Sequence, residues 1–158
     1  MKKMITLNIN SREYDLVIPA NRTLTQVLRE NLKLTGTKHG CEMGDCGSCT
    51  ILMDGQPVNS CLVLAVEAEG HTIITIEGLS DGEKLHPLQQ AFVEHGSIQC
   101  GFCSPGMILS AKALLDKNPS PNPAEIREAI SGNLCRCTGY QKIVEAVQSV
   151  GKGRIGQP

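Results

Sequence analysis

Residues 36–49 read Gly36-Thr-Lys-His-Gly-Cys-Glu-Met-Gly-Asp-Cys-Gly-Ser-Cys49, and this stretch decides how the first half of the chain folds. Its three cysteines are spaced C-x4-C-x2-C, and a fourth cysteine follows shortly after them. Glycines beside and between them can adopt the positive φ that turns backbone N–H groups inward, toward a bound anionic group. The stretch therefore predicts a loop wrapped around a metal centre held by sulfur. The candidate ligands are Cys41, Cys46, Cys49 and Cys61, and the glycines are Gly40, Gly44 and Gly47.

The same spacing is found in plant-type ferredoxins, in which four thiolates hold a 2Fe–2S cluster. A zinc site and unliganded buried thiols are the simpler alternatives. The chain has eight cysteines, and its first residues lack an apolar run long enough for a secretory signal, so we expect a cytoplasmic protein. Cysteines in that compartment bind metal more often than they form structural disulfides.

Composition narrows the class of function. The 158 residues suit one medium domain or two small ones. With 3% aromatic residues, no Trp and a net charge of -1, the chain has neither the stacking side chains nor the basic surface of a nucleic-acid-binding protein. Its longest apolar run is too short to cross a bilayer.

The first half alternates apolar and polar residues with the period of β-strands. Thr23 and Gln26 form a capping-box pair that begins one predicted helix, and Gly36 ends this unit. Asp54-Gly55 predicts a tight hairpin turn. The order strand, strand, helix, loop, strands predicts a β-grasp, ferredoxin-like α+β domain. The predicted strands are residues 4–9, 13–18, 50–53, 58–66 and 71–76, with Cys61 on the fourth.

After residue 78 the apolar period changes from two to 3.6, which predicts a bundle of four helices. These helices begin at Pro87, at Ser104-Pro105 with Ser104 as N-cap, at Asn122-Pro123 and at Gly139, and the third ends at Gly132. We therefore expect residues 1–78 to form the plant-type 2Fe–2S domain, 79–84 a linker, 85–150 a helical 2Fe–2S domain and 151–158 a flexible tail.

The helical half carries its own set of four cysteines. Cys100 and Cys103 lie just before the second helix, and Cys135 and Cys137 lie in the turn between the third and fourth. Two cysteines at each of two helix entries can build a four-sulfur site at one end of a bundle, where helix N-termini favour thiolates. The C-x-C pair is short for zinc, whose cysteine pairs are commonly C-x2-C.

Together, three stretches resemble the iron–sulfur subunit of the molybdenum hydroxylases, the xanthine dehydrogenase and aldehyde oxidoreductase family. They are residues 36–50, 99–107 and 133–140, and the resemblance extends over roughly residues 5–150. Where the family often has Gly, this chain has Met43, a difference that removes no ligand.

The resemblance implies an electron-transfer subunit of a heteromeric molybdenum-dependent oxidoreductase, which hydroxylates C–H bonds with oxygen from water. One partner would carry molybdenum on a pterin dinucleotide and another would carry FAD. This chain would carry two 2Fe–2S clusters and no catalytic residue, and electrons would pass from the pterin through the clusters to the flavin. An N-heteroaromatic compound such as nicotinate or a purine is the implied substrate. The implied assembly is a hetero-oligomer, as one heteromeric unit or as a dimer of it.

Residue by residue, the resemblance assigns two ligand sets. Gln99 matches a position whose side-chain amide contacts the pterin, and the sulfur of Cys137 matches one that also meets it. A solvated polar role for Gln99 is the alternative, and Arg136 either offsets the charge of a cluster or is solvated. The flavin-side set is Cys41, Cys46, Cys49 and Cys61, and the pterin-side set is Cys100, Cys103, Cys135 and Cys137.

Two other functions compete with this one. A free-standing two-cluster ferredoxin carrier would need neither Gln99 nor an apolar docking face on the bundle. A zinc-stabilised interaction module would be colourless, whereas a 2Fe–2S protein is red-brown. His39 is expected to be a loop residue near the first site, and the remaining histidines are expected at the surface.

Overall fold

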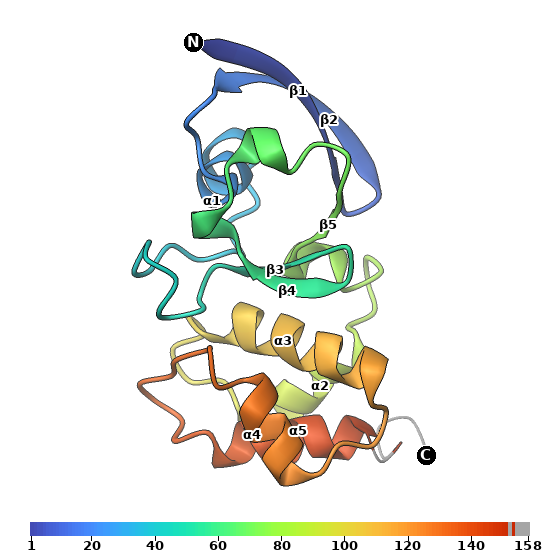
Figure 1. Cartoon of the computed structure of the whole chain (residues 1–158). Coiled ribbons are helices and arrows are strands. Elements are labelled where there is room, and N and C mark those ends of the chain that lie inside the picture. The colour runs from blue at the N-terminus through green and yellow to red at the C-terminus, as the bar shows by residue number, and fades with distance from the viewer. Residues whose placement is uncertain (152, 154–158) are drawn as a thin grey trace.

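The computed structural model describes residues 1–151 and 153 of the chain. A sheet with a short helix forms one half, and α3 (Ser104–Lys117) lies between that sheet and the remaining helices (Figure 1). The flexible tail predicted for residues 151–158 falls mostly outside the described residues. Gly151 is described, and it is the last residue of α5 (Gln141–Gly151).

The first half is built on a mixed sheet, five-stranded within the described residues, with the strand order β2-β1-β5-β3-β4. The central strand β5 runs parallel to its neighbour β1, and every other neighbouring pair is antiparallel. Leu7, Ile9, Ile51 and Ile73 point into one core beneath α1 and are fully buried. This is the ferredoxin-like α+β domain that the sequence predicted. The strands are β1 (Lys2–Ile9), β2 (Arg12–Pro19), β3 (Thr50–Met53), β4 (Gln56–Asn59) and β5 (Thr72–Ile74).

The helix of this half begins as predicted and ends earlier. Thr23 caps α1 (Leu24–Gln26), and Thr23 and Gln26 exchange both hydrogen bonds of a capping box. The helix then widens into one π-helical turn, η1 (Val27–Asn31), closed by the Leu32 N–H donating to the Val27 carbonyl at 3.1 Å. Lys33 stops the helix with φ 60, so the predicted end at Gly36 is wrong.

The predicted return strand over residues 58–66 is also wrong. The strand β4 ends at Asn59, and Ser60–Leu62 forms a turn of 3-10 helix, η2, that carries Cys61. A second 3-10 turn, η3, follows at Ala65–Glu67. The periodicity of a short apolar run does not distinguish a strand from a buried turn. Here the hydrogen bonds of Ser60 stabilise the turn.

The helical half is the predicted bundle, formed by α2 (Pro87–Glu94), α3, α4 (Pro123–Ala129) and α5. Its core includes the fully buried Phe92 and Met107. His86, expected at the surface, is half-buried and caps α2, because its Nδ1 accepts from the Leu88 N–H at 3.1 Å. The prediction that Ser104 is the N-cap of α3 is wrong, because Cys103 occupies the N-cap position. The third helix ends at Ala129, before the predicted Gly132.

The two halves share an apolar junction. Leu52 of β3 packs against Leu109 and Ala113 of α3, and all three are buried. Leu79, in the predicted linker, packs against both this junction and the helical core. The domain boundaries remain a prediction.

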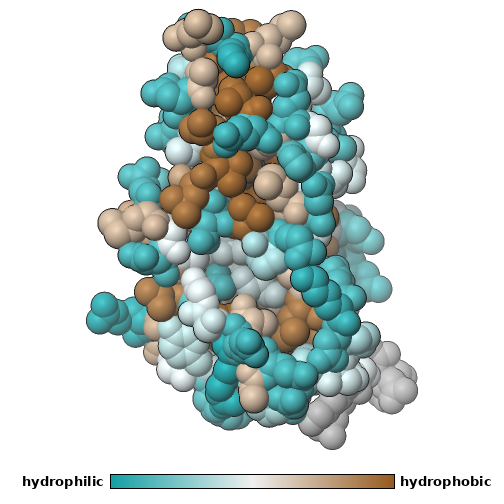
Figure 2. All heavy atoms as spheres, viewed as in Figure 1, coloured by the Kyte–Doolittle hydropathy of each residue, from teal (hydrophilic) through white to brown (hydrophobic). Residues whose placement is uncertain are grey.

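The surface is mixed in character. In Figure 2, hydrophobic residues gather along the upper half of the visible face, and the lower half is mostly hydrophilic. Within residues 1–151 and 153, no helix is both long and apolar enough to cross a bilayer.

Candidate metal centres

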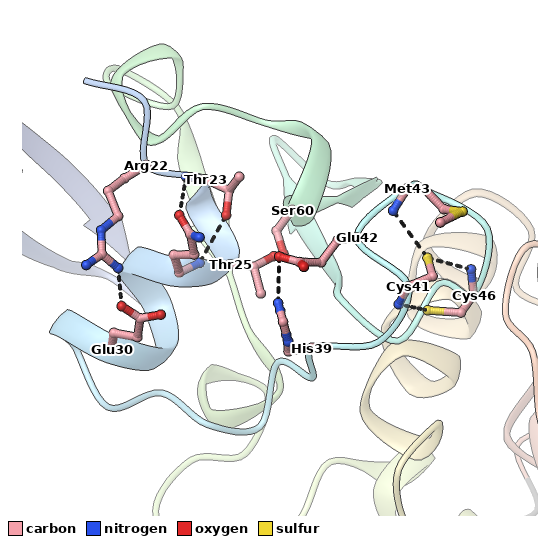
Figure 3. Close-up of polar contacts among 11 residues, drawn as sticks. Arg22, Thr23, Thr25, Glu30, His39, Cys41, Glu42, Met43, Cys46 and Ser60 are labelled. Atoms are coloured by element: carbon pink, nitrogen blue, oxygen red, sulfur yellow. Dashed lines mark hydrogen bonds and ion pairs between the residues drawn. The ribbon is translucent and has the colours of Figure 1, made fainter. Parts of the chain in front are cut away.

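The first cysteine loop points backbone N–H groups at sulfur (Figure 3). The Sγ of Cys41 accepts from the N–H groups of Met43 at 3.4 Å, Asp45 at 3.3 Å and Cys46 at 3.3 Å. The Sγ of Cys46 accepts in turn from the Cys41 N–H at 3.4 Å. These donors, the Met43 N–H foremost, lower the pKa of the Cys41 thiol to about 6. The loop therefore favours a thiolate at this position.

Positive φ in this loop falls at Gly44 (85), Gly47 (70) and Glu42 (58). The expectation that Gly40 needs a positive φ is wrong, because glycine is required there for space. A Cβ at Gly40 would lie 2.7 Å from the Sγ of Cys46 and 2.6 Å from the hydroxyl of Ser48. The sequence motif therefore located the loop correctly and misassigned one of its glycines.

The remaining two thiols of the first set form a buried pair. Cys49 is 3% exposed and Cys61 is 8% exposed, and the Cys49 thiol is near enough to act on the pKa of Cys61. Burial raises the pKa of the Cys61 thiol to about 11, and the neighbouring thiolates of Cys49 and Cys41 add to this rise. The four thiols thus converge as two pairs, Cys41 with Cys46 and Cys49 with Cys61.

Ser60 holds the buried pair in place. Its hydroxyl donates to the Cys49 carbonyl at 2.7 Å and lies 2.6 Å from the hydroxyl of Thr25 on α1. Ser60 and Thr25 are 0% and 1% exposed. This chain of hydrogen bonds ties η2, and with it Cys61, to both the cysteine loop and the helix.

The second set is also arranged as two pairs. The Cys135 thiol is near enough to act on the pKa of Cys103, and the Cys100 thiol acts on the pKa of Cys137 in the same way. Burial raises the pKa of Cys103 to about 12, and the Cys100 thiol raises that of Cys137. Burial also acts to raise the pKa of Cys135, but hydrogen bonds from Thr138 outweigh it and the net shift is downward.

The turn that carries Cys135 is closed by two side chains. Thr138 Oγ1 lies 3.0 Å from the Cys135 Sγ, and the Thr138 N–H donates to the same sulfur at 3.4 Å. The Cys135 N–H donates to the hydroxyl oxygen of Tyr140 at 2.8 Å. Tyr140 adopts φ 70 in this turn, a backbone angle outside the range preferred by residues other than glycine.

One pair of the second set opens to the surface. Cys100 and Cys137 are exposed, and Gln99 beside them is exposed as well. The sulfurs lie along an open hollow of about 420 Å³ whose lining also includes the side chains of Phe102 and Leu134, 46% and 55% exposed. The structure therefore places Cys100 and Cys137 on an accessible, partly apolar face, and Gln99 directly precedes Cys100 in the chain.

The two cysteine sets are adjacent. Cys46 of the first set lines the same hollow as the second set. The Leu134 N–H donates to the Cys46 carbonyl at 2.9 Å, and Leu134 directly precedes Cys135. The two cysteine loops thus meet backbone to backbone.

The chemistry of these donor sets fits 2Fe–2S clusters. In each set the thiols meet in pairs. In a 2Fe–2S cluster each iron takes two thiolates, so two pairs are the arrangement required. The inward N–H groups and the contact of Ser48 Oγ with Cys46 Sγ at 3.1 Å suit the anionic charge of such a cluster.

The other candidate residues have plainer positions. His39 is an exposed loop residue whose Nε2 pairs with the Glu42 carboxylate at 2.6 Å (Figure 3). Met43 is 66% exposed, and its backbone N–H donates to the Cys41 sulfur. Methionine in place of the glycine that the resemblance implies therefore keeps this hydrogen-bond donor. Arg136 is exposed between Cys135 and Cys137.

Sequence reasoning missed four residues that shape the sites. Each is a small polar residue within two positions of a cysteine and contacts a cysteine or the opposite loop. Proximity to a cysteine was the only sequence signal, and it does not reveal the partner. The four are Ser48, Ser60, Asn133 and Thr138.

Comparisons with known proteins agree with this division into two sites. The family described as the 2Fe-2S iron-sulfur cluster binding domain matches residues 7–75, and the family described as the 2Fe-2S binding domain matches residues 75–148. The nicotine 6-hydroxylase small subunit of Paenarthrobacter nicotinovorans is 55% identical over 96% of this chain and 91% of its own. The nicotinate dehydrogenase small FeS subunit of Eubacterium barkeri is 52% identical over 93% of this chain and 94% of its own. Among solved structures, a chain of quinoline 2-oxidoreductase from Pseudomonas putida 86 superposes with a TM-score of 0.93 and 49% identity, covering 99% of both chains.

Proposed function

Because this chain belongs to the family of 2Fe–2S subunits of the molybdenum hydroxylases, we propose that it relays electrons one at a time between cofactors on partner subunits. Its relatives include small subunits of the nicotine 6-hydroxylase and nicotinate dehydrogenase complexes. The observation that carries the proposal is the arrangement of eight thiols as two sets of two pairs, with the two sets in direct backbone contact.

Cys41, Cys46, Cys49 and Cys61 hold one cluster, and Cys100, Cys103, Cys135 and Cys137 hold the other. When bound, the clusters supply one-electron redox chemistry. The chain positions the thiolates, buries the Cys49–Cys61 pair and aims N–H and hydroxyl donors at the remaining sulfurs. Donors of this kind stabilise the more negative, reduced form.

The exposed face around Cys100 and Cys137 is where electrons enter. A partner subunit carrying molybdenum on a pterin dinucleotide docks there, and Gln99 contacts the pterin through its amide. The exposed apolar side chains of Phe102 and Leu134 support this orientation, since a free-standing carrier has no use for them. Cys41, Cys46, Cys49 and Cys61 would hold the cluster that supplies electrons to a partner carrying FAD.

An N-heteroaromatic compound is the proposed substrate class. Two relatives that are more than half identical to this chain are named for nicotine and nicotinate, and the similar structure is named for quinoline. Substrate conversion takes place on the partner, so this chain contributes electron transfer and no catalytic acid, base or nucleophile.

The test begins with the purified complex. It should contain about four irons and four acid-labile sulfides per copy of this chain, and two distinct EPR signals on reduction. Cys61→Ser should abolish one signal and leave the other, and Cys103→Ser should do the reverse. Retention of both signals in either variant would reject the ligand assignment.

A second experiment separates the subunit from a free-standing carrier. Gln99→Ala should lower turnover of nicotinate with an NAD(P) acceptor, or reduce pterin content, while the iron content stays constant. Gln56→Ala, an exposed glutamine on β4, is the matched control and should change neither. A monomer that transfers electrons without any co-purifying partner would favour the carrier.

A further inference from the structure

Asn133 lies at the point where the two cysteine loops meet. It is 5% exposed and precedes Cys135 by two positions. Its Nδ2 donates to the Gly47 carbonyl at 3.0 Å and to Thr50 Oγ1 at 3.2 Å, and its Oδ1 accepts from Ser110 Oγ at 2.8 Å. One buried side chain thus joins the first cysteine loop, the start of β3 and the helix α3.

Two glycines allow the loops to approach this closely. A Cβ at Gly47, which has φ +70, would lie 2.3 Å from the Gly132 carbonyl oxygen. A Cβ at Gly106 on α3 would lie 2.5 Å from the Gly47 carbonyl oxygen. Neither contact leaves room for a side chain, so the first loop rests directly on α3 and on the turn before Cys135.

The joint lies between ligands on both sides. Gly47 falls between Cys46 and Cys49, and Asn133 and Leu134 directly precede Cys135. Any movement of Asn133 relative to Gly47 therefore shifts one ligand set against the other. The rate of electron tunnelling falls steeply with the separation of two centres, so the function is sensitive to such a movement.

We propose that Asn133 is a positioning residue that fixes the distance and orientation between the two cluster sites. The proposal rests on the proposed function, because it requires a 2Fe–2S cluster in each set. The hydrogen bonds of the Asn133 side chain go to Gly47, Thr50 and Ser110, which are not cluster ligands. It acts through the backbone of the first loop, which it holds at Gly47.

The magnetic interaction between the two reduced clusters measures this geometry. The intact complex with Asn133→Ala is fully reduced, and the splitting of the low-temperature EPR signals is compared with the wild-type complex. The splitting should shift, because dipolar coupling falls with the cube of distance, while the g values of each cluster and the iron content stay at the wild-type level. A purely structural role would lower stability without moving the splitting.

Gly106→Ala is the second variant, and it keeps the Asn133 side chain. Alanine suits a helix, so α3 should form, but the added methyl group must displace the Gly47 carbonyl. The splitting should therefore shift in this variant as well. If Asn133→Ala fails to fold, the result for Gly106→Ala decides the proposal.

Asn10→Ala is the matched control. Asn10 also makes two side-chain hydrogen bonds, both to Thr75 at 2.9 Å, within the first half. This variant should keep the wild-type splitting. An unchanged splitting in Asn133→Ala or Gly106→Ala, with both clusters present, would overturn the positioning role alone. A wild-type complex with a single EPR signal and half the expected iron would overturn the proposed function itself.

Discussion

Two hydroxyl groups, one in each cysteine loop, lie against a sulfur. Ser48 Oγ is 3.1 Å from the Cys46 Sγ, and Thr138 Oγ1 is 3.0 Å from the Cys135 Sγ. A hydroxyl that donates to a ligand sulfur favours the reduced cluster, whose extra electron increases the negative charge on sulfur. Ser48 and Thr138 are therefore the side chains best placed to set the reduction potentials of the two clusters independently.

We expect Ser48→Ala to lower the reduction potential of the first cluster only. A differential of about 1 kcal/mol for the lost hydrogen bond corresponds to roughly 40 mV, at about 59 mV and 1.4 kcal/mol per tenfold change. Thr138→Val should lower only the second potential by a similar amount. EPR-monitored redox titration measures both, and each variant is the control for the other. A shift of both potentials in one variant would contradict the prediction.

The cysteines also differ in their expected reactivity once the iron has been removed. Backbone N–H groups lower the pKa of Cys41 to about 6, whereas burial raises that of Cys61 to about 11 and that of Cys103 to about 12. At pH 7 Cys41 is mostly thiolate and the other two are neutral, so iodoacetamide should modify Cys41 first. Lowering the pH below 6 protonates Cys41 and should slow its modification.

Mass spectrometry after brief alkylation gives the order of modification. Unfolding the iron-free protein in urea is the control, because it removes both the N–H donors and the burial. Similar rates for Cys41, Cys61 and Cys103 in the folded protein would contradict the prediction.

At the scale of elements, the short turn η2 shows what periodicity could not reveal. The sequence placed Cys61 on a strand because the residues after Asp54-Gly55 are largely apolar. The structure ends that strand at Asn59, because Ser60 bonds to the Cys49 carbonyl and to Thr25. A strand and a buried turn share the same composition, so only the tertiary partner of Ser60 distinguishes them.

We expect Ser60→Ala to lower the free energy of unfolding by roughly 1–3 kcal/mol. The loss leaves the buried hydroxyl of Thr25 without this partner and removes a donor from the Cys49 carbonyl. Urea unfolding measures the change. Ser131→Ala is the control: the hydroxyl of this exposed serine donates to the Glu128 carbonyl, and the effect of its loss should stay within about 0.5 kcal/mol. Equal effects of the two substitutions would show that Ser60 has no special role.

Two of the helix starts, by contrast, could be predicted from local sequence. The capping box at Thr23 was predicted from residue spacing and forms. The predicted helix start at Asn122-Pro123 also forms, with Asn122 as the N-cap. Such caps depend on side chains three positions apart, so no distant contact is needed to predict them. The π-helical turn after α1 has no comparable local signature and was not predicted.

At the scale of the whole molecule, the motifs predicted both halves but not the way they join. The junction depends on backbone carbonyls of Cys46, Gly47 and Gly132, and a carbonyl leaves no mark in the sequence. The apolar part of the junction is equally hard to predict from the sequence, because Leu52, Leu109 and Ala113 look like ordinary members of two separate cores. The sequence could therefore predict the two sites, and only the fold could reveal their contact.

The junction should make the two halves unfold together. Leu109 is 1% exposed and packs across the interface, so Leu109→Ala should destabilise the protein by roughly 2–5 kcal/mol. We expect the visible absorbance of both clusters to be lost in a single transition, in wild type and in the variant, with the variant shifted to lower urea. Two separate transitions in the wild type would contradict this coupling.

The openness of Cys100 and Cys137 has a consequence for the life of the subunit before it meets its partners. Dissolved oxygen and peroxide reach exposed sulfurs more readily than buried ones, so an unassembled chain should suffer oxidative damage first at this end. Docking of a large subunit would then shield these sulfurs from oxidants in addition to providing a route for electrons. We therefore expect prompt assembly to lengthen the lifetime of the iron centre held by Cys100 and Cys137.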